Sequence, residues 1–119
     1  MKIVLPDTNI ILWTFNGGKD FREAISLAAP EHQIMIPTCV LEELKKMGNK
    51  QSTAALSLCE NMKTIDIGKG YADDLLIKSA KKGHLIATND KEILTHLKNE
   101  GINALRIREK NKIVMTEKQ

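Results

Sequence analysis

The sequence predicts an α/β fold in which a parallel sheet of four or five strands lies between two layers of helices. The chain of 119 residues, with a mass of 13.3 kDa, has the size of one domain. Short apolar runs alternate along it with amphipathic stretches, which is the order of strands and helices in α/β proteins. The apolar runs are almost free of polar residues, as in strands that are covered on both faces. We therefore expect residues 1–119 to form a single three-layer α/β/α domain.

The predicted elements follow one another without a linker or a repeat. Predicted strands are the apolar runs at residues 3–5, 34–36, 65–67, 85–87 and 105–107. Predicted helices are the stretches of helical composition at about residues 20–29, 38–47, 52–62, 71–82 and 91–100. Pro37, Gly83 and Gly101 stand at element ends, where proline and glycine interrupt regular structure. Residues 106–115 contain a charged turn, so they form either an edge hairpin or a trailing strand.

The composition excludes several classes of protein. A chain with 42% hydrophobic and 28% charged residues is neither disordered nor collagen-like. Its apolar runs are far shorter than the roughly 20 residues of a membrane span, and its first residues lack a secretory signal, so we expect a cytoplasmic protein with no membrane partner. The net charge of +3 favours polyanionic partners. Aromatic residues, at 3%, are too few for the stacking platforms of many single-strand binders.

Two aspartates follow predicted strands at the same edge of the sheet. Asp7 comes directly after the first strand in VLPDTN, and Asp90 comes after the fourth in LIATND. The carboxyl ends of parallel strands form the edge at which α/β proteins bind ligands. Aspartate is also a preferred N-cap where a strand leads into a helix, so each of the two is either a cap or a functional group.

Two predicted helices supply further acids in neighbouring pairs. At about 100° per residue, Glu43 borders the apolar stripe of its helix, whereas Glu42 points away from it. The same indexing places Asp73 near the centre of the inner face of its helix and Asp74 on the polar face. A carboxylate among apolar neighbours needs a hydrogen bond, a counter-charge or a metal ion. Asp73 is therefore either a helix cap or a ligand.

Acids that converge at one edge repel one another, and a divalent cation removes that penalty. Cys39, Cys59 and the three histidines are scattered without the spacing of a zinc site, which leaves carboxylate oxygens as the ligands. Oxygen ligands suit a hard ion, Mg²⁺ or Mn²⁺. Such an ion orients a phosphodiester, ionises a water molecule and neutralises the leaving oxygen. The residues thus predict a metal-dependent nuclease or phosphotransfer site.

The chain resembles the PIN-domain ribonucleases over nearly its whole length. Four segments carry the resemblance in the family's order: VLPDTNIIL, CVLEELKKMG, YADDLLIKSA and LIATNDKEI. Carried over from the family, the metal-binding catalytic acids correspond to Asp7, Glu43, Asp73 and Asp90. The resemblance further implies that Asn9 and Thr88 support the acids by hydrogen bonding, with ordinary turn and strand-end bonding as the alternative. Asp74, next to Asp73, is the competing choice for the third acid or an auxiliary ligand that acts through water.

The resemblance also implies an activity. PIN-domain ribonucleases cut RNA endonucleolytically with a water activated by Mg²⁺ or Mn²⁺, and they leave a 5′-phosphate and a 3′-hydroxyl. The family includes VapC-like toxins, which an antitoxin protein neutralises, and nucleases that mature ribosomal RNA; both branches stay open for this chain. Trp13, Phe15 and Phe21 are either core residues or the interface of a homodimer.

Other functions compete with this interpretation. A phosphatase with an aspartate nucleophile would carry Asp-x-Asp after the first strand, where this chain has Asn9. A phosphoacceptor signalling domain would carry paired acids there, whereas Asp7 stands alone. The main alternative is a catalytically inactive PIN-like module that binds RNA or protein and uses its acids as caps and surface charges.

Overall fold

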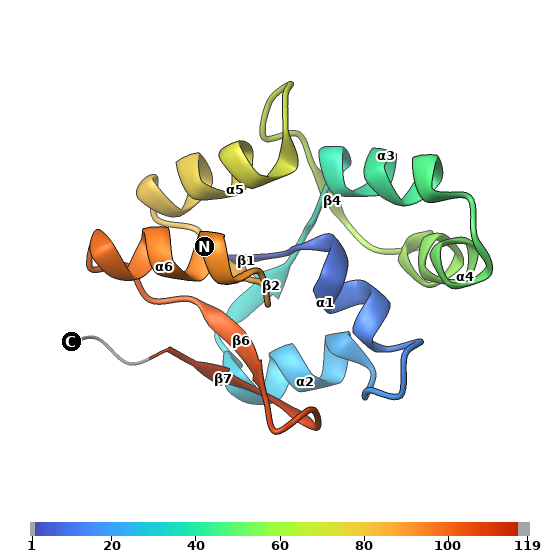
Figure 1. The fold of residues 1–119 in the computed structure, drawn as a ribbon, viewed down its shortest axis with the longest axis horizontal. Coiled ribbons are helices and arrows are strands. Elements are labelled where there is room, and N and C mark those ends of the chain that lie inside the picture. Colours follow the sequence, from blue (N-terminus) through green and yellow to red (C-terminus); the bar gives the residue numbers. More distant parts are fainter. Residues whose placement is uncertain (1, 117–119) are drawn as a thin grey trace.

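A five-stranded sheet lies at the centre of the computed structural model, which describes residues 2–116 (Figure 1). Its strand order is β2-β1-β5-β6-β7. The bounds are β1 Lys2–Pro6, β2 His32–Ile34, β5 Leu85–Ala87, β6 Leu105–Arg108 and β7 Lys112–Met115. The first four strands in this order are parallel, and β7 pairs antiparallel with β6. The predicted sheet is therefore confirmed, and its last two strands form the edge hairpin.

Two further short strands form a separate ladder. β3 (Ile36–Pro37) pairs in parallel with β4 (Thr64–Ile65). The predicted strand at residues 34–36 is thus divided, because Met35 still donates its N–H to the carbonyl of Val4 whereas Ile36 donates to Lys63. The strand predicted at 65–67 belongs to this ladder and not to the central sheet.

Six helices surround the strands within residues 2–116. Their bounds are α1 Thr8–Trp13, α2 Phe21–Ala28, α3 Thr38–Met47, α4 Lys50–Cys59, α5 Ala72–Lys81 and α6 Lys91–Asn99. Five of them were expected, and α3 has the predicted bounds. The helix α1 was not predicted from the sequence. Its buried residues are Thr8, Ile10, Ile11 and Trp13, so apolar side chains occupy consecutive positions and do not form a stripe with helical spacing.

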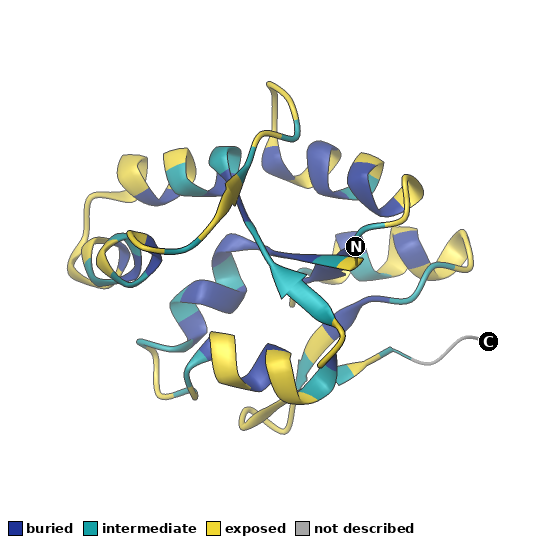
Figure 2. Cartoon of the chain, turned by 180° about the vertical axis from the view of Figure 1, so that it is seen from behind, coloured by how far each residue is buried: buried dark blue, intermediate teal, exposed yellow. Residues whose placement is uncertain are grey.

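Two apolar clusters, one on each face of the sheet, produce the three layers. Val4 and Ala87 face a cluster that includes Ile10 of α1. Leu5 and Ile86, their neighbours along the strands, face the other cluster, which α5 and α6 cover. This alternation follows from the two-residue period of a strand. In Figure 2 the central strands and the inner sides of the helices are buried, and the outer helix surfaces are exposed.

The aromatic residues near the N-terminus belong to the core. Phe21 is completely buried, Trp13 is almost so, and Phe15 packs against the same cluster. These side chains therefore do not form the exposed patch that a dimer interface would need at this place.

Within residues 2–116, no helix has the length and apolar character needed to cross a bilayer.

The parallel register of β1 and β5 brings distant parts of the chain together. Pro6 lies opposite Ala87, and the N–H of Asp7 donates a 2.8 Å hydrogen bond to the carbonyl of Ala87. The residues that follow the two strands therefore start side by side at the carboxyl edge of the sheet, which is where ligands bind in this class of fold.

Candidate active site

Asp7 is the buried centre of the site. It caps α1 from the end of β1 and is 4% exposed. Its Oδ1 accepts a 2.8 Å hydrogen bond from the N–H of Thr8, and its Oδ2 accepts one of 2.7 Å from the hydroxyl of Thr88 and one of 3.3 Å from Nδ2 of Asn9. Three donors therefore fix the orientation of this carboxylate.

Thr88 and Asn9 also connect Asp7 to the loop after β5. The hydroxyl oxygen of Thr88 accepts a hydrogen bond of 3.1 Å from the N–H of Asp90. Oδ1 of Asn9 accepts one of 3.0 Å from the N–H of Asn89. Both side chains thus form hydrogen bonds with the buried carboxylate and with the loop that carries Asp90.

Asp90 is the N-cap of α6. Its Oδ1 accepts hydrogen bonds of 2.8 Å from Glu92 N–H and 3.3 Å from Ile93 N–H. The cap interpretation of this residue is correct as far as that oxygen is concerned. Among residues 2–116, Oδ2 of Asp90 has no hydrogen-bond donor, so one carboxylate oxygen is left for a ligand.

Glu43 and Asp73 come from the helices above the end of β1 (Figure 1). Glu43 lies in the middle of α3 and is exposed. Asp73 lies in the first turn of α5 and is also exposed, so the inner position predicted for it is wrong. The buried stripe of α5 contains Leu75 instead of Ile77, which turns the stripe away from Asp73. The N-cap of α5 is Tyr71, so Asp73 is not a cap.

The electrostatics of Asp7 show which acids lie near it. Burial raises the pKa of Asp7, and the hydrogen bonds from Thr88 and Thr8 oppose this increase. The negative charges of Asp73 and Glu43 raise the same pKa further. The structure therefore brings one acid from α3 and one from α5 toward the buried carboxylate.

Asp73 couples the site to α6. Partial desolvation is the first cause that raises the pKa of Asp73, although the residue is largely exposed. The charges of Asp90, Asp74 and Glu92 raise that pKa further. Asp74 itself is exposed beside Asp73 in the first turn of α5. An acidic edge thus extends from Asp7 through Asp73 to the start of α6.

The donor set fits a hard cation by its chemistry. All candidate ligand atoms are carboxylate oxygens, and their mutual repulsion is what a divalent ion relieves. The hydroxyl of Thr8, next to Asp7 in the chain, is buried without a hydrogen-bond partner in the described part of the protein. Across residues 2–116, however, no three His, Cys, Asp or Glu side chains stand close enough together to coordinate one ion. For the acids to coordinate one ion together, the exposed carboxylates of Glu43 and Asp73 would have to rotate.

Two residues near Asp7 were not among the expected site residues. Cys39, in the first turn of α3, has its pKa raised first by burial and in smaller part by the charges of Glu43 and Asp7. Thr8 has the buried unpaired hydroxyl. Thr8 directly follows Asp7 in the sequence, and Cys39 lies on the same helix as Glu43. These positions could have indicated both residues.

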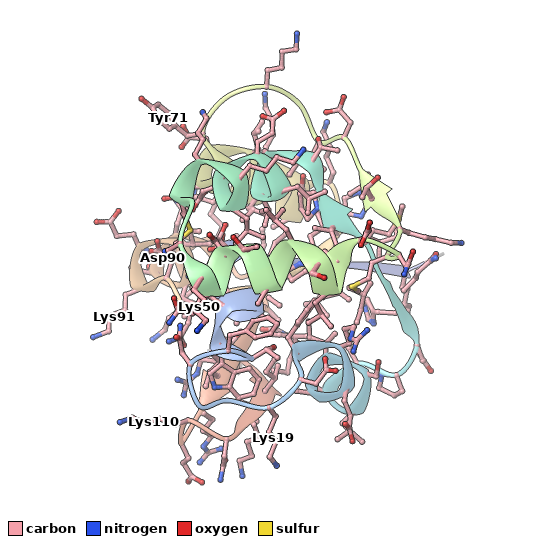
Figure 3. All side chains as sticks on the ribbon, turned by 90° about the vertical axis from the view of Figure 1, so that its right-hand side faces the viewer. Lys19, Lys50, Tyr71, Asp90, Lys91 and Lys110 are labelled. Carbon is pink, nitrogen blue, oxygen red and sulfur yellow. The ribbon has the colours of Figure 1, made fainter. Side chains whose placement is uncertain are left out.

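Two lysines lie on the side of the molecule from which Asp90 projects. In Figure 3, Tyr71, Asp90 and Lys91 project on the same side of the molecule, with Lys50 below Asp90 in this view. Tyr71 is 83% exposed at the start of α5. An anionic chain that approaches from this side would therefore meet the charges of Lys50 and Lys91 as well as those of the acids.

Comparison with known proteins identifies the family. A family model described as a PIN-like domain matches residues 3–110. Ribonuclease VapC4 of Methanocaldococcus jannaschii is 29% identical over 119 aligned positions, which cover 90% of this chain and 91% of that protein. The structure of the PIN domain endonuclease Utp24 superposes with a TM-score of 0.79 and 27% identity over 94% of this chain and 89% of that one.

The fold and its acidic edge thus define a PIN-like domain. The chain belongs to this family, and the expected relationship to the PIN-domain ribonucleases is confirmed.

Proposed function

We propose that residues 1–119 form one endoribonuclease domain that hydrolyses RNA phosphodiester bonds with Mg²⁺ or Mn²⁺. The observation that carries this proposal is the state of Asp7: its carboxylate is buried, oriented by three donors and destabilised by the charges of Asp73 and Glu43. The relatives named above, a ribonuclease and an endonuclease, support the same activity. Residue 1 and residues 117–119 of the proposed domain lie outside the described residues.

The proposal assigns a role to each side chain. The ion would be held by the four acids Asp7, Glu43, Asp73 and Asp90. When bound, a divalent ion supplies the charge that ionises a water and neutralises the leaving oxygen of a phosphodiester. Thr88 and Asn9 keep Asp7 in one orientation. Asp74 is an auxiliary acid that reaches the site through water.

A cleavage assay tests the proposal. Single-stranded RNA should be cut with Mg²⁺ or Mn²⁺, cutting should stop with EDTA, and the products should carry 5′-phosphates and 3′-hydroxyls. Asp7→Asn keeps the shape of the side chain and removes its charge, so it should abolish cutting while the circular dichroism spectrum stays that of the wild type. Equal cutting by wild type and Asp7→Asn, or cutting that resists EDTA, contradicts the proposal.

The cellular role of the activity is the finer part of the proposal. The similarity to VapC4 favours a cytoplasmic toxin with an antitoxin protein as its partner, and the similarity to Utp24 favours RNA processing. A small overlapping upstream reading frame with a DNA-binding pattern would favour the toxin. A position among ribosome-assembly genes would favour processing.

A specific observation also favours a second function, a PIN-like module that binds RNA without cutting it. Throughout residues 2–116 the acids do not form a closed ligand set, and Oδ1 of Asp90 is occupied by the cap of α6. On this alternative, RNA binding is unaffected by EDTA and no metal restores cleavage. The assay above, repeated with a binding measurement, separates the two functions.

A further inference from the structure

A groove with a volume of about 490 Å³ lies between α6 and the β6–β7 hairpin. Leu94, Ile102 and Val114 supply apolar surface along it. Its charged lining residues are Lys98, Arg106 and Arg108, and none of the described lining residues is Asp or Glu. We call this feature the α6–β6 groove. Its volume falls within the range of about 300–1,000 Å³ that is usual for small-ligand sites.

The strand register explains why the two arginines face the groove. Leu105 and Ile113 are buried in the core on one face of the hairpin. Arg106 lies opposite Val114, and side chains alternate between the two faces along a strand, so the arginines are on the other face. Among residues 2–116, neither Arg106 nor Arg108 nor Lys98 makes an ion pair. Within the described residues, therefore, no acid neutralises these three cations by direct contact.

The groove begins about one helical turn from the acidic edge. β6 is parallel to β5, so its last residue, Arg108, lies toward the edge at which Thr88 follows β5. α6 begins directly after its cap Asp90, and Leu94, one turn later, already lines the groove. An extended polyanion that crosses the acids would enter the groove at this end.

We propose that the α6–β6 groove binds one nucleotide of single-stranded RNA next to the bond that is cut. Its phosphate is bound by Arg106 and Arg108, whose planar guanidinium groups match phosphate oxygens, and by Lys98. Its base or ribose lies on the apolar surface of Leu94 and Ile102. That the RNA continues from the groove to the acids rests on the proposed nuclease function, but binding in the groove does not require cleavage.

RNA fits these observations better than an acidic protein segment does. The cations stand beside apolar surface in a hollow of nucleotide size, and Leu94 at one end of it lies one helical turn from Asp90, where we place phosphodiester chemistry. The cluster of carboxylates would repel an acidic peptide. It would attract RNA once the proposed ion is bound there, because that ion would bind a phosphate group.

The test is RNA binding in EDTA, which makes it independent of catalysis. A fluorescently labelled single-stranded RNA octamer is titrated with wild type, with Arg106→Gln/Arg108→Gln, and with the control Lys63→Gln/Lys82→Gln. The control loses the same charge at two exposed residues outside the groove. Thermal unfolding confirms that each variant is folded.

We expect the arginine variant to bind about tenfold more weakly and to lower the slope of log affinity against log salt by about 0.7, since the two arginines share one phosphate and each single-strand phosphate contact contributes about 0.7. The lysine control should stay near wild type. Equal losses in both variants, or no loss in the arginine variant, overturn the proposal. A wild type that prefers a hexaglutamate peptide to the octamer, and loses that preference with the arginines, also overturns it in favour of a protein partner.

Cleavage distinguishes a failure of this proposal from a failure of the proposed function. If the chain is a nuclease, the arginine variant should raise KM for the octamer and leave kcat close to wild type. If no metal-dependent cleavage occurs but the arginine variant still loses RNA affinity in EDTA, RNA binding in the groove is supported and the nuclease function is contradicted. If cleavage occurs and the arginine variant binds and cuts like wild type, RNA binding in the groove is contradicted and the nuclease function is supported.

Discussion

The hydroxyl of Thr88 donates a 2.7 Å hydrogen bond to Oδ2 of Asp7 across a sequence separation of 81 residues. The same oxygen of Thr88 accepts the N–H of Asp90. One buried side chain thus joins the acid that follows β1 to the acid that begins α6. Because the bond favours the charged form of Asp7, it opposes the increase in pKa that burial causes.

Removing this hydroxyl should weaken both stability and function. Thr88→Val leaves the buried carboxylate without its shortest hydrogen bond, which costs about 1–3 kcal/mol in the free energy of unfolding. RNA cleavage should fall by about 10- to 100-fold, as for residues that orient metal ligands. Urea unfolding and initial rates of cleavage measure the two effects.

Thr88→Ser is the matched control, because it keeps the hydroxyl and removes one methyl group. It should cost about 0.8 kcal/mol for that group and retain most of the activity. Comparable losses of activity in the serine and valine variants would show that the hydroxyl does not position Asp7.

The raised pKa of Asp7 predicts a pH-dependent gain in stability for Asp7→Asn. The native state binds the proton of Asp7 more tightly than the unfolded state, so the contribution of Asp7 to stability decreases as pH rises from its unfolded pKa near 4 through its raised folded pKa. At pH 7, above the unfolded pKa, ionisation of Asp7 favours the unfolded state, and Asp7→Asn removes this cost. We expect a higher melting temperature than wild type at pH 7 and a difference that shrinks as pH approaches 4.

The exposed control Glu60→Gln removes the same charge from the surface and should leave the melting temperature at pH 7 close to that of wild type. A melting temperature of Asp7→Asn below wild type at pH 7, with no relative gain over the acidic range, would contradict the effect of burial on Asp7.

Glu42 and Glu43 form a natural pair for testing the site. Both are exposed, so Glu42→Gln and Glu43→Gln should each change the free energy of unfolding by less than about 0.5 kcal/mol. The charge of Glu43 acts on Asp7, so Glu43→Gln alone should reduce cleavage, by at least about tenfold. Metal titrations of the cleavage rate measure the difference. Equal rates for the two variants would remove Glu43 from the proposed ligand set.

Gly18 should be a sensitive position for a steric reason. A Cβ at Gly18 would overlap the indole of Trp13, whose Nε1 donates a 3.2 Å hydrogen bond to the carbonyl of Lys110 in the β6–β7 turn. Gly18→Ala should therefore cost about 1–3 kcal/mol and shift the emission of Trp13, the chain's single tryptophan.

Gly17→Ala is the comparison, because a Cβ there has free space and only the φ of +83° is unfavourable. It should cost about 1 kcal/mol and leave the emission of Trp13 unchanged. An emission shift as large in Gly17→Ala as in Gly18→Ala would show that loop conformation matters and the close contact does not.

Local pattern predicts the elements of this fold well where one face of the element is apolar. The helix at residues 38–47 and the strand at 85–87 were predicted with the bounds that the structure shows. Local pattern fails where burial is complete or where the hydrogen-bond partner changes. The helix α1 has no polar face apart from its start, and the strand at 34–36 exchanges one partner for another after Met35.

The candidate site shows the same division. The order of Asp7, Glu43, Asp73 and Asp90 along the chain was sufficient to indicate the PIN family. Helical indexing misplaced Asp73, because the buried stripe of α5 includes Leu75, and only packing against the sheet reveals that stripe.

The sequence by itself determined the α/β class, the family and the acids at strand and helix starts, because these depend on residues that are close together in the chain. The tertiary structure decided that Thr88 orients Asp7, that Glu43 and Asp73 act on its charge, and that a basic groove follows α6. Those relationships depend on β1 pairing with β5 and β5 with β6, and the register of distant parallel strands is not encoded in any local pattern.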